Sequence, residues 1–165
     1  MKSLHTYPIA RILRMQVLSA FLFFCISDAF AQDRGHALII GIGQYSSESG
    51  SSPLLGIAKD LSNARKMALA MGIPNHRIQE LRDAEATKSN IIQALNRIKQ
   101  DTESGERVFI YFSGHGTRYS TPKGCKEGLV PYTPGRMLQG EEISEAELAQ
   151  LTSKISEKAD KAIVM

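Results

Sequence analysis

Cysteine is scarce in this sequence, which carries only two thiols in 165 residues. Cys25 lies in an N-terminal segment that we expect to be removed, and this would leave Cys125 as a single thiol. A single thiol excludes an intramolecular disulfide, so the fold must be stabilised by its hydrophobic core. The roughly 130 remaining residues suffice for an independent α/β domain.

The sequence also lacks an apolar run long enough to cross a membrane. The run over residues 17–26 has about 10 residues, whereas a membrane-spanning helix needs about 20. A membrane anchor is therefore the less favoured interpretation of this segment. A lipid-modified Cys25 is disfavoured as well, because the bulky Phe24 stands before it.

The order of features around this run is typical of a secretory signal peptide. Lys2, Arg11 and Arg14 precede the run, and Ala29-Phe30-Ala31 follows it as a small-residue cleavage pattern. The sequence therefore predicts a signal peptide over residues 1–31 and a mature domain over residues 32–165. We expect the protein to be exported, either periplasmic or secreted, with no membrane attachment after cleavage.

Positive charge is not in real excess once this leader is set aside. Removing residues 1–31 lowers Lys plus Arg from 20 to 17 and Asp plus Glu from 17 to 16, which leaves a net charge of about +1. A nucleic-acid-binding domain usually presents a basic field. We therefore expect no nucleic-acid partner.

The mature sequence alternates strand-like and helix-like segments. Short apolar runs predict buried strands, and apolar residues at helical spacing predict amphipathic helices. Thr87 and the pair Ser144 and Glu147 have the positions of helix-capping residues. This alternation predicts one α/β domain with a mainly parallel sheet and right-handed crossovers. The expected strands are residues 36–43, 77–82, 107–112 and 161–165; the helices span about 57–71, 87–98 and 144–151, and a long loop spans about 117–140.

Ser113-Gly114-His115-Gly116 follows the most apolar of these strands. In open parallel sheets, reactive groups gather at the carboxyl ends of the strands. Glycine on both sides leaves the imidazole open and exposes nearby backbone N–H groups, as a general acid–base histidine beside an oxyanion donor requires. The alternative is an ordinary turn in which His115 is only a polar residue.

Four blocks follow one another along the sequence. They are His36-Ala-Leu-Ile-Ile-Gly-Ile-Gly-Gln-Tyr45, Leu55-Gly56 with Asp60, Val108-Phe-Ile-Tyr-Phe-Ser-Gly-His-Gly-Thr117, and Gly128-Leu-Val-Pro-Tyr132. Together they resemble successive motifs of the caspase-like cysteine peptidases of peptidase family C14, in particular the metacaspase and bacterial branch. The resemblance implies a caspase-like three-layer α/β/α fold with a mainly parallel sheet, incomplete at its C-terminus.

The same resemblance implies roles for four residues. His115 matches the catalytic histidine of a Cys–His dyad, and Gly116 matches the glycine whose amide binds the oxyanion. Asp60 and Ser113 match positions that line the substrate pocket, where an acid would favour cleavage after Arg or Lys. A carboxylate in the first turn of a helix is also favoured by the helix dipole alone, so Asp60 has a structural alternative.

The nucleophile of such peptidases lies in an Asp-x-Cys-His-Ser-Gly-like segment at the end of the next strand. This sequence stops at Met165, where that strand begins, so we expect a fragment that is inactive by itself. Cys125 stands in the expected loop and is a poor substitute. The alternative function is a non-catalytic caspase-fold binding or scaffold module, and legumain-like or clostripain-like peptidases are a minor third option.

No cofactor is expected, and the expected partner is a peptide or protein substrate. Glu141 and Glu142 fall near positions where some metacaspases place calcium ligands, but two acids fall short of the six or more oxygens that calcium takes. His36 and His76 lie at or before the amino-terminal ends of strands, so we expect no metal site that includes His115. The helix after Gly41-Ile-Gly43 starts too late for a dinucleotide cradle.

Overall fold

The computed structural model describes residues 34–122 and 124–165, and Arg34–Met165 forms one compact unit. The predicted signal peptide lies outside the described residues. In the described ranges, no helix is both long enough and apolar enough to cross a membrane.

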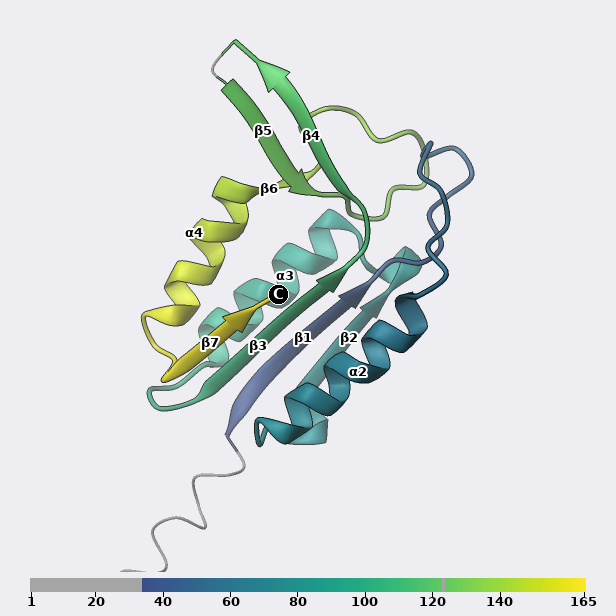
Figure 1. Ribbon diagram of the computed structural model, residues 1–165. Helices are drawn as coiled ribbons and strands as arrows, with labels where there is room; N and C mark the ends of the chain where they lie inside the picture. The colour runs from purple at the N-terminus through teal and green to yellow at the C-terminus, as the bar shows by residue number, and fades with distance from the viewer. Residues whose placement is uncertain (1–33, 123) are drawn as a thin grey trace, which may run out of the picture. The chain divides into compact units, whose positions relative to one another are not determined.

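The described chain is built around a four-stranded parallel sheet in the order β2-β1-β3-β7 (Figure 1). Its strands are β1 (Gly35–Gly41), β2 (Ile78–Arg82), β3 (Arg107–Ser113) and β7 (Lys161–Val164). All three pairings are parallel, and the β1–β3 ladder runs from Gly35↔Arg107 to Gly41↔Ser113. The predicted strands are therefore confirmed, each to within a residue or two.

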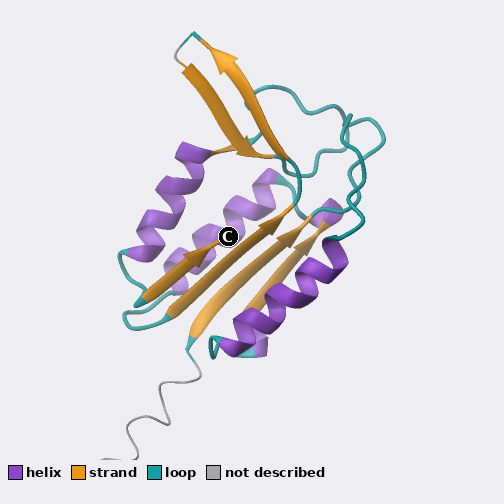
Figure 2. Cartoon of the chain, in the orientation of Figure 1, coloured by secondary structure: helices purple, strands orange, loops and turns teal. Residues whose placement is uncertain are grey.

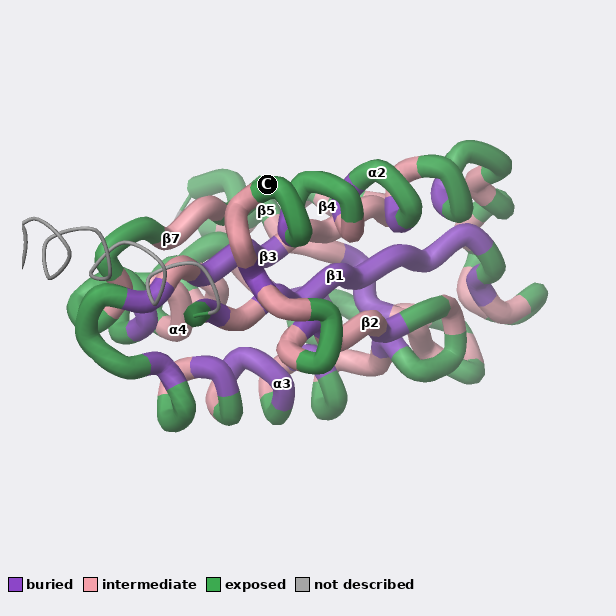
Figure 3. The backbone as a smooth tube through the Cα atoms, turned by 90° about the horizontal axis from the view of Figure 1, so that it is seen from below, coloured by how far each residue is buried: buried purple, intermediate pink, exposed green. Residues whose placement is uncertain are grey.

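Helices cover both faces of this sheet. One face carries α2 (Ile57–Ala70), and the other carries α3 (Lys88–Asp101) and α4 (Glu145–Ser156). Two 3-10 turns, Asn75–Arg77 and Asp83–Glu85, flank β2. Viewed along the layers, the buried strands lie between α2 and α3 (Figure 3). This confirms the predicted α/β/α arrangement of a mainly parallel sheet.

The strand residues alternate between two apolar clusters, as the two-residue period of a strand dictates. Leu38 and Ile40 face α3 and α4, whereas Ala37 and Ile39 face α2. Phe109 is completely buried in the α2 cluster at the centre of β3. The continuous apolar runs of β1 and β3 thus reflect burial on both sides.

Both predicted helix caps are present. The Thr87 hydroxyl accepts a hydrogen bond from Asn90 N at 3.2 Å, and the Ser144 hydroxyl accepts one from Glu147 N, also at 3.2 Å. The helix that begins after Ser144 continues to Ser156, beyond the predicted end near residue 151. Ile155, in the later part of this helix, is buried in the core. Because this packing stabilises the last turns, the helix extends beyond the residues whose sequence pattern predicted it.

The predicted long loop over residues 117–140 is wrong in its first half. Residues there form β4 (Gly116–Thr121) and β5 (Gly124–Leu129), an antiparallel hairpin that β6 (Ile143–Ser144) extends (Figure 2). Most of the hairpin is exposed, so its sequence lacks the apolar alternation that predicts a half-buried strand. The glycines of this segment led to the prediction of a loop. Gly124 lies at the turn of the hairpin, where it adopts a positive φ of 112°.

A buried carboxylate ties the amino-terminal edge of the sheet together. Glu106 is only 2% exposed; it accepts hydrogen bonds from Arg77 Nη1 at 2.7 Å and from Glu103 N at 2.9 Å, and His36 Nε2 lies 3.5 Å away. Burial by itself would raise the pKa of Glu106. The hydrogen bonds from Glu103 N and Arg77, with the charges of His36 and Arg77, outweigh it and hold this pKa below its ordinary value of 4.5.

A lowered carboxyl pKa stabilises the fold above the unfolded value, and this contribution is lost as the pH falls through the folded value. The unfolding free energy should therefore decrease as the pH drops below about 4.5. Glu106→Gln should lower stability at neutral pH and flatten this acid dependence, measured by urea unfolding at several pH values. The exposed Glu103→Gln is the matched control; equal pH slopes in the two variants would contradict the assignment.

Candidate active site at the carboxyl edge of the sheet

The segments after β1 and β3 meet at one edge of the sheet because the two strands run parallel. Gly41 pairs with Ser113 at the end of the ladder, and Ile42 N donates to Ser113 O at 2.9 Å. His115 follows two residues later. The imidazole therefore stands at the carboxyl edge, beside the loop that connects β1 to α2, as predicted.

The His115 ring is oriented by a backbone carbonyl. Its Nε2 atom lies 2.7 Å from the carbonyl oxygen of Ser52, in the loop before α2. Because a carbonyl oxygen can only accept a hydrogen bond, Nε2 must carry the proton. In the neutral ring, Nδ1 is then the acceptor, and His115 is only partly buried. The side chain can therefore take a proton at Nδ1 while Ser52 holds its other nitrogen.

Gly116 offers a backbone donor next to this ring. It opposes Leu129 in the β4–β5 ladder, and Val130 N donates to His115 O at 2.9 Å. This pattern makes Gly116↔Leu129 a pair whose members exchange no hydrogen bonds, so the Gly116 N–H points away from β5. A Cβ at Gly116 would meet only Gly128 O, at 3.7 Å. Chain crowding therefore does not explain glycine at this position.

Asp60 and Ser113 lie side by side. The Ser113 hydroxyl donates to Asp60 Oδ2 at 2.8 Å, although the residues are 53 positions apart in the sequence. Asp60 occupies the first turn of α2, and both side chains are partly buried. The structure therefore brings together the two residues that the sequence predicted for a substrate pocket.

Comparison with known proteins identifies this arrangement. The family model of the peptidase C14 caspase domain matches residues 34–156. The chain belongs to the caspase-domain family. Its sequence is 30% identical to metacaspase-1 of Candida albicans over 89 residues, a stretch that covers 50% of this chain and 19% of the metacaspase.

A solved structure supports the fold of this caspase domain. The crystal structure of protein GSU0716 from Geobacter sulfurreducens superposes with a TM-score of 0.62 at 21% sequence identity. The match covers 79% of this chain and 48% of the Geobacter chain. The chain thus spans about half of the solved structure and about a fifth of the metacaspase.

Cys125 lies away from the edge of the sheet that carries His115. It is exposed on β5, where it pairs with Ser120. The prediction that Cys125 lies in a loop is therefore wrong. Four residues of extended strand separate Cys125 from Leu129, the partner of Gly116, a distance of about 13 Å. Since β5 is hydrogen-bonded to β4, Cys125 cannot fold back toward His115 while the hairpin is intact.

The acidic pair after the hairpin is used for structure. Glu142 is 3% exposed; it accepts hydrogen bonds from Tyr119 Oη at 2.7 Å and Gly140 N at 2.8 Å. These donors, with the charge of Lys88, lower the pKa of Glu142 although burial alone would raise it. Glu141 accepts from Leu138 N at 2.7 Å.

Calcium does not fit these acids. In residues 34–122 and 124–165, no group of three or more His, Cys, Asp or Glu side chains could hold a metal ion. A calcium site needs six or more oxygens, and the Glu142 carboxylate already serves Tyr119 and Gly140.

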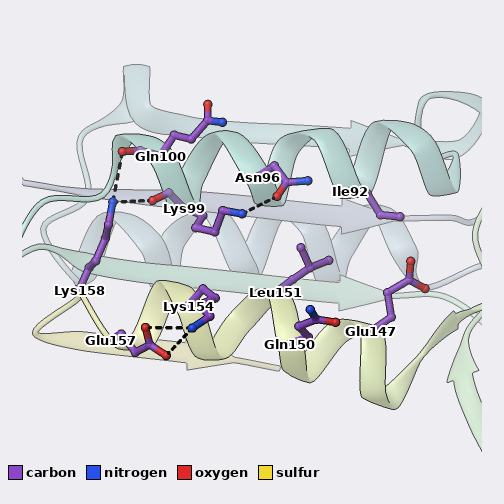
Figure 4. A pocket seen from close by; sticks show the side chains of 10 residues that line it. All are labelled: Ile92, Asn96, Lys99, Gln100, Glu147, Gln150, Leu151, Lys154, Glu157 and Lys158. Atoms are coloured by element: carbon purple, nitrogen blue, oxygen red, sulfur yellow. Dashed lines mark hydrogen bonds and ion pairs between the residues drawn. The ribbon is translucent and has the colours of Figure 1, made fainter.

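A pocket of about 720 Å³ between α3 and α4 is separate from this edge (Figure 4). Its charged groups already have partners within the fold. Lys158 donates to Lys99 O at 2.8 Å at the end of α3, and Lys154 lies 3.2 Å from Glu157. A second pocket, of about 430 Å³, reaches Gly116 and is lined also by Gly128, Leu129 and Leu148. Of these two pockets, the second borders the site.

Sequence reasoning missed three residues that organise the site. Ser52 acts through its carbonyl, which side-chain patterns do not reveal, and Tyr45 was only part of a family motif. Asp83 adopts a positive φ of 44°, and its Oδ1 accepts hydrogen bonds from Gly43 N and Gln44 N, each at 2.8 Å. It therefore fixes the start of the loop that follows β1.

Asp83→Ala should destabilise the domain by about 2 kcal/mol, because it removes two charge-assisted hydrogen bonds and places alanine at a positive φ. Denaturant unfolding measures this change. Asp83→Asn is the matched control, because asparagine tolerates this backbone conformation and retains an acceptor oxygen. If both variants lose the same stability, neither the backbone conformation nor the acceptor oxygen sets the cost.

Proposed function

We propose that this caspase domain supplies the histidine of a Cys–His endopeptidase that cleaves peptide bonds after Arg or Lys. The observation that carries the proposal is the His115 ring, held through Nε2 by Ser52 O with Nδ1 available at the carboxyl edge. We also propose that the protein acts after export, as residues 1–31 predict.

The proposed chemistry follows from these atoms. Nδ1 of His115 takes the proton of a cysteine thiol, and the thiolate attacks the carbonyl carbon of the scissile peptide. The Gly116 N–H donates to the resulting oxyanion. The imidazolium then protonates the leaving amine and the thioester forms. In the second half, His115 takes a proton from water, hydroxide attacks the thioester, and the released thiolate recovers the proton.

We place the source of the thiol on the β7 side of the site. Met165 N donates to Ile110 O and Met165 O accepts from Phe112 N, both at 2.9 Å. A thiol one or two positions beyond Met165 on the line of β7 would lie beside the residues that follow Phe112 in β3. We propose that the thiol reaches His115 from this side of β3.

The preference for basic residues rests on Asp60. Its carboxylate lies at the carboxyl edge and keeps one hydrogen bond from Ser113. A partly buried carboxylate binds a guanidinium or ammonium group more strongly than a fully solvated one does. An acidic substrate side chain would instead be repelled, so peptides with Asp at the cleavage position should be poor substrates.

The proposal is tested with the protein as its own gene encodes it, assayed on fluorogenic peptides that end in Arg, Lys or Asp. Hydrolysis should follow Arg and Lys and not Asp, and His115→Ala should lower kcat/KM by about 10²–10⁴-fold. Cys125→Ala is the matched control and should leave the rate unchanged. The 165-residue chain by itself should give no hydrolysis above background.

Two results would overturn this proposal. Turnover by the 165-residue chain that survives Cys125→Ala and disappears in His115→Ala would show that no further thiol is required. Absence of hydrolysis by the native gene product would support the second candidate, a non-catalytic caspase-fold binding module. That candidate is favoured by one observation: in the described part of the chain, the single thiol is on the hairpin and remote from His115.

A further inference from the structure

Tyr45 joins the two backbone segments that flank the proposed catalytic histidine. The side chain is 8% exposed and comes from the loop directly after β1. Its hydroxyl accepts a hydrogen bond from His115 N at 2.9 Å and donates one to Val130 O at 3.1 Å. Val130 N in turn donates to His115 O at 2.9 Å. Tyr45, His115 and Val130 therefore form a closed set of three hydrogen bonds, here called the tyrosine clasp.

The tyrosine clasp requires a neutral hydroxyl, because one group must both donate and accept. Burial raises the pKa of Tyr45 against the opposing effect of the His115 N–H, and the charge of Asp83 raises it further. The hydroxyl therefore keeps its proton at neutral pH, and both of its hydrogen bonds are available over the range in which a histidine would work.

Two neighbours restrict the position of this hydroxyl. The Tyr45 and His115 rings are 5.0 Å apart between centroids and inclined by 47°. A Cβ on Gly114 would lie 2.9 Å from Tyr45 Oη and 2.8 Å from Phe112 Cζ, closer than real Cβ contacts allow. Glycine at position 114 thus leaves the space that the hydroxyl occupies.

The loop that carries Tyr45 is itself fixed. Asp83 accepts hydrogen bonds from Gly43 N and Gln44 N, the two residues before Tyr45. Leu54 N donates to Gly43 O at 2.9 Å, which closes the far end of the loop near Ser52. The two groups that hold His115, the Tyr45 hydroxyl and the Ser52 carbonyl, therefore belong to one braced segment.

We propose that Tyr45 is a positioning residue of the site: its hydroxyl fixes the His115 backbone so that the imidazole stays on Ser52 O with Nδ1 turned to the incoming thiol. The contribution of this positioning to catalysis rests on the proposed peptidase function. The geometry itself can be measured without any catalysis, so the two proposals fail separately.

The test uses the full chain labelled with ¹⁵N and compares Tyr45→Phe with the wild type by NMR. Tyr45→Phe should make both the His115 amide and the His115 ring Nε2–H exchange with water about three- to tenfold faster, the effect of one lost hydrogen bond. His115→Gln identifies the ring signal, because that signal disappears. Unfolding by urea is recorded for each variant, so that global loss of stability is separated from the local change.

Tyr111→Phe is the matched control. Tyr111 is a half-buried tyrosine on β3, and within the described residues its hydroxyl makes no hydrogen bond. This variant should leave both His115 exchange rates at their wild-type values.

Gly114→Ala tests the same hydrogen bond between Tyr45 and His115, because its methyl group displaces the Tyr45 hydroxyl. This variant replaces Tyr45→Phe if Tyr45→Phe does not fold. Unchanged exchange at His115 in a folded Tyr45→Phe or Gly114→Ala variant would overturn the positioning role. If exchange at His115 becomes faster as predicted but the native gene product has no peptidase activity, the positioning role of the tyrosine clasp stands and the proposed peptidase function is rejected.

Discussion

The parallel ladder between β1 and β3 is the constraint on which the site depends. Its register places Gly41 beside Ser113, so the segments that follow the two strands leave the sheet at the same point. The first segment carries Tyr45 and Ser52, and the second carries His115. A slip of this ladder by one residue would turn alternate side chains to the opposite face and separate the imidazole from both of its partners. The apolar runs of β1 and β3, buried on both faces, hold this register.

The histidine is oriented by main-chain and hydroxyl groups rather than by a second charged side chain. Ser52 contributes its carbonyl oxygen, which any residue with the same backbone conformation could supply. The requirement is therefore placed on the shape of the loop after β1, and Asp83 maintains that shape at a positive φ. Asp83, in the turn after β2, and the buried Tyr45 therefore matter to the site as much as the residues that would touch substrate.

The sequence predicted those features whose signals are local. The runs that became β1 and β3, the cap at Thr87 and the capping pair Ser144 and Glu147 were all recognisable within a few residues. The β4–β5 hairpin was missed because it is mostly exposed and lacks apolar alternation. The resemblance assigned Asp60 and Ser113 to one pocket but did not predict the hydrogen bond between them. Ser52 and Tyr45 contact His115 across 63 and 70 residues of sequence. No local pattern reports such contacts, least of all one made by a carbonyl.

The most direct test of the central claim is a crystal structure of the native gene product after reaction with a peptidyl-arginine chloromethyl ketone, which alkylates an activated thiol. We predict a modified cysteine beside β3, within hydrogen-bond distance of His115 Nδ1, with Nε2 still bonded to Ser52 O and the arginine side chain at Asp60. Modification of Cys125 on the hairpin, or an imidazole turned away from the carboxyl edge, would contradict it.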